Sequence, residues 1–314
     1  MNRRDALICC VLITSGLIAS FAAPATETRP GDWTLRHSAE PGKVEFTLMY
    51  HRHGNHSDHS SDWPLTAFIG LDVTKSGHQE VKFTISRDAG RFDCEGYLND
   101  GEGAGLFRFQ PDAKYESEMK SLGFTDIDED KQFSMAVMDV SFDFAKEMKG
   151  EHLRGLDTDK LIAFRIFKVD SKFIRELRSV GLSAEDCDKL VAFRIHGVTP
   201  EMVRFVKQSG YNPDEDTLIA MSIHGVSPEL MTQLQKEGYD HVDLQQLIAF
   251  RIHGVSPDFI QKVQGLGYEH PKPDQLVAMR IHGVTPEYIT DLRSRGMKDL
   301  TIDQLVSLRI HGID

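Results

Sequence analysis

The sequence predicts a multidomain protein: a small antiparallel all-β domain near the N-terminus, followed by an all-α solenoid of two-helix repeats. Three observations support this prediction. A His-Gly pair recurs every 28 or 29 residues, and similar residues surround each recurrence. Before residue 110, apolar and polar residues alternate as they do in strands. The repeated histidines are His196, His224, His253, His282 and His311.

The repeat frame extends backward from the His-Gly pairs to about residue 111. Val169 and Val140 occupy the position of Val198 at steps of 29 residues. Residues 115–123 also match residues 288–296 in residue types and spacing. We therefore expect seven units of about 29 residues. They begin near residues 111, 140, 169, 198, 226, 255 and 284.

The first helix of each unit, which we call helix A, begins at a hydroxyl-Pro-acid sequence such as residues 256–258. The hydroxyl accepts from a free amide, proline has no amide to lose, and the acid faces the positive end of the helix dipole. Apolar residues then follow at helical spacing, as in Phe259, Ile260 and Val263. A glycine ends the helix at residues 181, 210, 238, 267 and 296.

The second helix of each unit, helix B, is clearest in residues 247–253, Leu-Ile-Ala-Phe-Arg-Ile-His. A capping-box spacing precedes it, as in Asp243 with Gln246. The helix is almost apolar all round apart from the arginine and histidine near its end. We therefore expect it to lie inside, between its neighbours, and to end at Gly254 or the equivalent glycine.

Residues 30–110 show the period of two that is typical of half-buried strands. The alternation is clearest over residues 43–50 and 81–86, and residues 88–90 and 99–105 provide turns. We expect an antiparallel sheet or sandwich of about five to seven strands. The helical array is expected to occupy residues 111–314.

Composition and the chain's first residues bound the class of protein. The chain has 314 residues, of which 40% are hydrophobic, enough for two folded regions. Its net charge of −12 disfavours nucleic acid as a partner. Residues 1–25 have the basic start, apolar run and small-residue end of a secretory signal peptide. We therefore expect an exported protein, periplasmic or extracellular, with no membrane span once the signal is removed. An uncleaved membrane anchor is the alternative.

A histidine-rich tract is the sharpest candidate for a chemical site. Neutral imidazoles bind zinc, copper or nickel, and His51 and His53 share a face if the preceding strand continues. The alternative is a solvated polar loop without a ligand. We favour the loop and expect no cofactor, with a divalent metal as the alternative. The tract contains His51, His53, His56 and His59.

Two further ladders of repeated residues lie in the array. We expect the histidine ladder to be structural, because Phe167 and Met138 occupy the same position in two earlier units. The arginines near the end of helix B complement its dipole, with first-turn acids such as Asp258 as partners. The alternative is a row of guanidinium groups that contacts an anionic ligand or a partner. These arginines are Arg165, Arg194, Arg251, Arg280 and Arg309.

The amino-acid sequence of residues 247–260 resembles the tandem repeats of a group of largely uncharacterised exported bacterial proteins. Those repeats are similar to arrays attached to antirepressor-type membrane metallopeptidases. The resemblance covers residues 80–314 and implies a binding or sensory role by analogy. It implies no catalytic residues, because this chain lacks a zinc-peptidase motif.

The sequence therefore predicts an exported, non-catalytic scaffold that binds a protein or peptide or acts in sensing. Metal binding by the histidine tract is the first alternative, and an enzyme with a site at the domain junction is the second. HExxH, GxSxG, Walker A and CxxC motifs are absent from the sequence. We also expect a weak homodimer through the C-terminal repeat, because no polar helix covers its last face.

Overall fold

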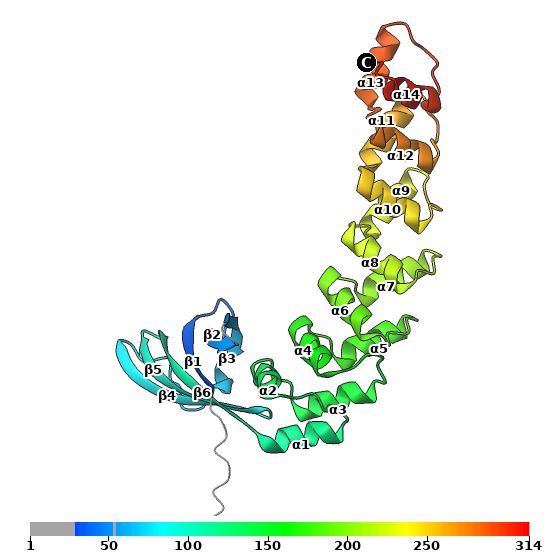
Figure 1. The fold of residues 1–314 in the computed structure, drawn as a ribbon. Coiled ribbons are helices and arrows are strands. Elements are labelled where there is room, and N and C mark those ends of the chain that lie inside the picture. The colour runs from blue at the N-terminus through cyan, green and yellow to red at the C-terminus, as the bar shows by residue number, and fades with distance from the viewer. Residues whose placement is uncertain (1–28, 53–54, 314) are drawn as a thin grey trace, which may run out of the picture. The chain divides into compact units, whose positions relative to one another are not determined.

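The computed structural model describes residues 29–52 and 55–313, which form two compact units (Figure 1). The first unit contains residues 29–85 and 91–111, and the second contains residues 86–90 and 112–313. The predicted fold class is confirmed, because a six-stranded antiparallel sheet precedes a repeated arrangement of helices. The expected signal peptide, residues 1–25, lies outside the described residues. No described helix is long and apolar enough to cross a membrane.

The sheet has the strand order β3-β2-β1-β6-β5-β4. Strand β1 pairs antiparallel with both β2 and β6, and β2 pairs antiparallel with β3. Beyond β3, Ile69 forms an isolated bridge with Thr84 of β4. The strands are β1 (Arg29–His37), β2 (Lys43–Arg52), β3 (Asn55–Pro64), β4 (His78–Arg87), β5 (Gly90–Asn99) and β6 (Glu102–Pro111).

The core of the sheet unit is aromatic and is centred on Phe46. Its ring lies 5.0 to 6.2 Å, centroid to centroid, from four other aromatic rings in edge or stacked contacts. Such pairs stabilise a core beyond the area that they bury. The alternation predicted for residues 43–50 is confirmed by the burial of Val44, Phe46 and Leu48. The four neighbouring rings belong to Trp33, Trp63, Phe68 and Phe83.

The solvated loop that we favoured for the histidine tract is wrong for residues 55–62, which belong to strand β3. Its register with β2 pairs Val44 with Trp63 and Leu48 with His59. The Trp63 ring is buried, and its Nε1 donates to Ser61 Oγ at 2.8 Å. Because only every second side chain of this strand faces the core, and few of those are apolar, the sequence does not show its alternation.

The turn that we expected over residues 99–105 is also shorter than predicted, because β6 begins at Glu102. The glycines of this region allow a close approach of backbone and side chain within the sheet. A Cβ on Gly96 would lie 2.6 Å from Gly105 Cα and 2.7 Å from the Trp33 ring. The Trp33 Nε1 donates to the carbonyls of Glu95 and Leu106 at 3.3 and 3.1 Å. These glycines therefore make room for a buried indole.

The second unit contains, among the described residues, fourteen helices of nine or ten residues that form seven A–B pairs (Figure 1). The A helices are α1 (Ala113–Ser121), α3 (Phe142–Gly150), α5 (Ser171–Ser179), α7 (Pro200–Gln208), α9 (Pro228–Lys236), α11 (Pro257–Gly265) and α13 (Pro286–Ser294). The B helices are α2 (Glu129–Val137), α4 (Thr158–Phe167), α6 (Cys187–His196), α8 (Glu215–Ile223), α10 (Leu244–His253), α12 (Pro273–Ile281) and α14 (Ile302–Ile310).

The predicted caps are present at the starts of the A helices. In α7, α9, α11 and α13, the N-cap hydroxyl accepts from the third helical amide at 3.1 to 3.3 Å, directly before proline. At the B helices, the Asp243 side chain accepts from the backbone amides of Gln245 and Gln246, as its capping-box spacing predicts for the N-cap. A complete capping box forms between Thr301 and Gln304 at the start of α14. Helix α10 ends at Gly254 with a φ of 72°, whereas Lys168 adopts a φ of 57° at the same place after α4. The repeat is therefore strained at this non-glycine residue.

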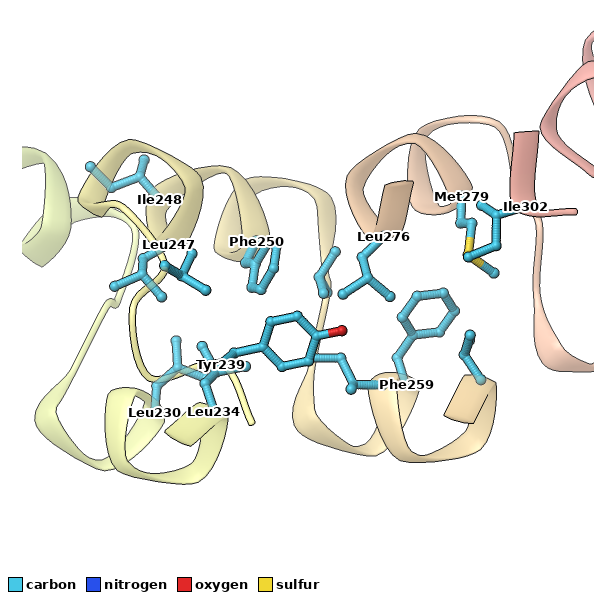
Figure 2. Packing of buried hydrophobic residues seen from close by; sticks show 14 of the residues in the cluster. Leu230, Leu234, Tyr239, Leu247, Ile248, Phe250, Phe259, Leu276, Met279 and Ile302 are labelled. Carbon is cyan, nitrogen blue, oxygen red and sulfur yellow. The ribbon is translucent and has the colours of Figure 1, made fainter. Parts of the chain in front are cut away.

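Neighbouring units pack in two rows, with B helices against B helices and A helices against A helices. From α7 to α14, one cluster of buried apolar residues, Val206 to Leu305, runs between the rows. Figure 2 shows Leu234 and Tyr239 of one unit lying near Leu247 and Phe250, with the Tyr239 hydroxyl directed toward the next unit. That hydroxyl donates to the carbonyl of Pro271 at 2.6 Å. Apolar packing and inter-unit hydrogen bonds together hold the B helices at a fixed register.

Candidate binding surface of the helical array

An exposed isoleucine near the end of six of the seven described B helices, α4 to α14, is the main feature of the array's surface. The six side chains are 48 to 57% exposed, although isoleucine is usually buried. Our expectation that helix B lies inside the molecule is therefore wrong for one of its faces. We call this set the isoleucine ladder: Ile166, Ile195, Ile223, Ile252, Ile281 and Ile310.

A second aliphatic row widens the ladder on the same face. Residues four apart lie above one another on a helix, and a branched aliphatic residue precedes each ladder isoleucine by four positions. Five of these side chains are half-buried and one, Ile248, is buried. The result is an apolar stripe that crosses six successive B helices. The second row is Ile162, Val191, Ile219, Ile248, Val277 and Val306.

A row of aspartates borders this stripe at the starts of the B helices. The aspartate stands seven residues before the ladder isoleucine, so two helical turns place both on one face. Each accepts from the third residue of the preceding helix B. The aspartates are Asp159, Asp188, Asp216, Asp274 and Asp303, and Gln245 replaces the acid in α10.

The charge of this aspartate row changes along the array. In the N-terminal units, Lys131, Lys160 and Lys189 pair with the next unit's aspartate. In the C-terminal units, the donors to Asp274 and Asp303 are the amides of Gln246 and Gln275, at 3.0 and 3.2 Å. An amide donates a hydrogen bond without supplying positive charge. The aspartates on α12 and α14 therefore receive no positive charge from this donor.

The arginine ladder connects successive units. The Nε of Arg165, Arg251, Arg280 and Arg309 donates at 3.1 to 3.2 Å to a carbonyl at the end of the preceding helix B. The Arg194 guanidinium instead lies 3.7 Å from the centroid of the Phe173 ring. Carbonyls at a helix end lack an intrahelical donor. The arginine of one unit therefore supplies a donor to the helix B of the unit before it. The first-turn acids that we expected as partners are not the groups that accept from these Nε atoms.

The histidine ladder contributes mainly its backbone to this arrangement. The carbonyls of His224 and His253 accept from Arg251 and Arg280, and the carbonyl of His196 accepts from Ser222. Four of the five ladder imidazoles are exposed, and that of His253 is half-buried. Within the described part of the chain, no three His, Cys, Asp or Glu side chains are placed to hold one metal ion.

The histidine tract falls partly outside the described residues. His53 is not described, and the side chains of His51 and His56 are not described either. The backbone register pairs His51 with His56 at the end of the β2–β3 hairpin. His59 lies opposite Leu48, its Nε2 is 3.2 Å from Ser61 Oγ, and burial lowers its pKa. A metal site at the tract remains a prediction.

The described cysteines are poorly suited to nucleophilic chemistry. Burial raises the pKa of the Cys94 thiol above its ordinary value, and burial raises the pKa of Cys187 to about 12. A thiol that stays protonated is a weak nucleophile.

A groove of about 550 Å³ on the sheet unit passes Cys94. Polar groups along this groove are already paired with one another, in the Lys82–Glu95 ion pair and the Thr84–Asp93 hydrogen bond.

Neither a scan against protein-family models nor a search of curated proteins found a match to this chain. The arginine and histidine ladders were predicted from the sequence, but the isoleucine ladder was not, because apolar residues recur together along the B helices. A helical wheel of helix B could have predicted it. On such a wheel, the aspartate and the ladder isoleucine lie on the side opposite Phe250 and its equivalents.

Proposed function

We propose that this protein is a non-catalytic scaffold whose helical array binds a polypeptide partner through the apolar stripe on the B helices. The observation that carries this proposal is the isoleucine ladder, which exposes the same side chain in six successive units. Contiguous exposed apolar surface with a polar border is typical of protein interaction sites. Stacked repeats commonly present such an extended surface to a partner.

The construction of the array supports binding by a pre-formed surface. Arginine-to-carbonyl bonds join the B helices, and the hydroxyls of Tyr211, Tyr239 and Tyr268 donate to the next unit at 2.6 to 2.9 Å. A rigid surface loses less conformational entropy on binding than a mobile one. A sensory role and export of the chain are part of this proposal, as the resemblance and residues 1–25 imply.

Metal binding by the histidine tract is the second candidate function. It is supported by the backbone pairing of His51 with His56, which brings two histidine positions together across a hairpin. Calorimetric titration with zinc, copper or nickel tests it. The expected result is tight binding that disappears when the four histidines of the tract are replaced by alanine, and unchanged heats would contradict it.

A cross-linking pull-down from the cell envelope tests the proposed scaffold function. The full chain and a variant with Ile223→Ser, Ile252→Ser and Ile281→Ser are compared for the proteins that they retain. The matched control carries Ile69→Ser and Leu106→Ser, because these sheet residues are 60% and 57% exposed. We expect specific partners to be lost from the array variant and kept by the control. Equal capture by all three proteins would contradict the proposal.

A further inference from the structure

We infer that the C-terminal part of the stripe, on α10, α12 and α14, takes an extended basic segment of a partner with an aliphatic residue at every third position. This inference rests on the proposed function, because it names the kind of polypeptide that the stripe would bind. It depends on two properties of the described surface. One is the spacing of the ladder, and the other is the charge along its border.

The spacing of the ladder favours a polyproline II conformation. Helices in direct contact have axes about 8 to 10 Å apart, and α10, α12 and α14 pack directly in sequence. A polyproline II segment rises about 9.3 Å over the three residues of one turn, so every third side chain returns to the same face. A β-strand alternates faces with a period of two, so its third residue points away from the ladder.

The remaining residues of such a segment face the borders of the stripe. A polyproline II helix has three residues per turn. If one aliphatic residue of each turn contacts Ile252, Ile281 or Ile310, the other two residues of that turn face the two borders of the stripe. One flank meets Asp274 and Asp303, which are exposed and accept from the neutral side-chain amides of Gln246 and Gln275. Lysine or arginine on that flank of the partner would pair with these carboxylates.

The opposite border of the stripe, at the ends of the B helices, contains arginines whose positive charge is partly offset. The Nε atoms of Arg251 and Arg280 donate to helix-end carbonyls, and the Arg280 guanidinium lies 5.1 Å from the Phe259 ring centroid. Helix-end carbonyls carry partial negative charge that offsets these cations. The whole chain is acidic, with 48 Asp and Glu residues against 36 Lys and Arg, which attracts a basic partner over a distance.

The array contains its own comparison for this charge argument. Lys160 and Lys189 form ion pairs with the aspartates of α6 and α8, whereas Gln246 and Gln275 donate neutral amides to those of α12 and α14. A Gln246→Lys, Gln275→Lys variant copies the N-terminal pattern into the C-terminal units. It keeps the inter-unit hydrogen bonds and does not alter the isoleucine ladder. It therefore changes the charge of the border alone.

A synthetic peptide of six Leu-Pro-Lys triplets is the probe, titrated against the full chain and followed by fluorescence anisotropy at low salt. We expect saturable binding that is at least tenfold weaker for the matching Leu-Pro-Glu peptide. A peptide of the same composition with leucine at irregular spacing should also bind more weakly. Equal affinity for the three peptides, or no binding of the Leu-Pro-Lys peptide, would overturn the inference.

Two variants identify the surface that the peptide uses. The Gln246→Lys, Gln275→Lys variant should bind the Leu-Pro-Lys peptide about tenfold more weakly, because the exposed ion pairs with Asp274 and Asp303 are lost. A tenfold change corresponds to about 1.4 kcal/mol. The Ile252→Ser, Ile281→Ser variant should lose most of the affinity. If neither variant changes binding, the peptide uses another surface and the inference is wrong. Ladder-dependent capture in the pull-down without peptide binding would refute the basic partner and leave the proposed function standing.

Discussion

The sheet unit and the helical array reach a stable fold by different routes. In the sheet, Phe46 and four other aromatic rings form one cluster contributed by segments far apart in the sequence. In the array, each unit packs on the next, and bonds such as Arg280 to His253 recur at one-unit steps. The sheet is therefore expected to fold as a single cooperative body, whereas the array combines local stabilities of neighbouring units.

This difference explains why the array can expose isoleucine. Because its stability comes from contacts between successive helices, the outer face of helix B is not needed for the core. Phe250 and Leu247 are buried inward, while Ile252 on the same helix is 54% exposed. The sheet unit has fewer such repeated positions, although Ile69 and Leu106 are exposed there. A repeated surface is thus a property that the array alone provides on a regular spacing.

The largest expected effects come from truncating a central ring in each unit. Phe46→Ala and Phe250→Ala should each lower the free energy of unfolding by about 3 to 5 kcal/mol, because both rings are fully buried. Hydrogen exchange should rise throughout the six strands for Phe46→Ala. For Phe250→Ala, the rise should be confined to α9–α12 and their neighbours. Uniform exchange across the whole array in the second variant would show that the array unfolds as one body.

A smaller effect is expected from the hydroxyl that joins two units. Tyr239→Phe removes the bond to the Pro271 carbonyl and should cost about 1 kcal/mol of stability. Burial raises the pKa of Tyr239 to about 12 from an ordinary value of 10.0. The neutral phenol is therefore favoured in the folded state, and its contribution is complete below pH 10 and is lost as the pH rises through 12.

Urea unfolding at pH values between 8 and 12 measures this contribution. The Tyr239→Phe variant should lose less stability over this interval than the original chain does. The pKa of Tyr211 is also raised, mainly by burial, so some dependence on pH should remain in the variant. Identical pH profiles for the two proteins would show that the Tyr239 hydroxyl does not stabilise the contact between units.

The smallest expected effect concerns the end of α4. Lys168 has a φ of 57° where α6 and α10 are followed by Gly197 and Gly254. Glycine adopts this left-handed conformation without the steric cost of a Cβ atom. Lys168→Gly should therefore stabilise the array by about 0.5 to 1 kcal/mol, seen as a higher midpoint in urea. An unchanged or lower midpoint would mean that the lysine makes a favourable contact that offsets its strain.

Local chemistry made the array predictable from sequence. Caps at Thr285 and Ser256, prolines after them and glycines at fixed spacing specify helix ends directly. Strand β3 was missed because most of its residues are polar and only alternate positions such as Trp63 meet the core. The exposure of Ile252 was missed because a residue's type does not reveal which helix face a neighbouring unit covers. The aspartate row was missed because its Lys or Gln donor lies in another unit.

The most direct test of the central claim is site-specific photo-cross-linking in cells that produce the protein. A photoreactive residue is placed at Ile252, on the ladder, or at Gln233, an exposed position of helix α9. We predict that the reagent at position 252 captures a partner protein and that the reagent at position 233 does not. Capture from position 233 alone, or from neither position, would contradict the proposal that the apolar stripe is the binding surface.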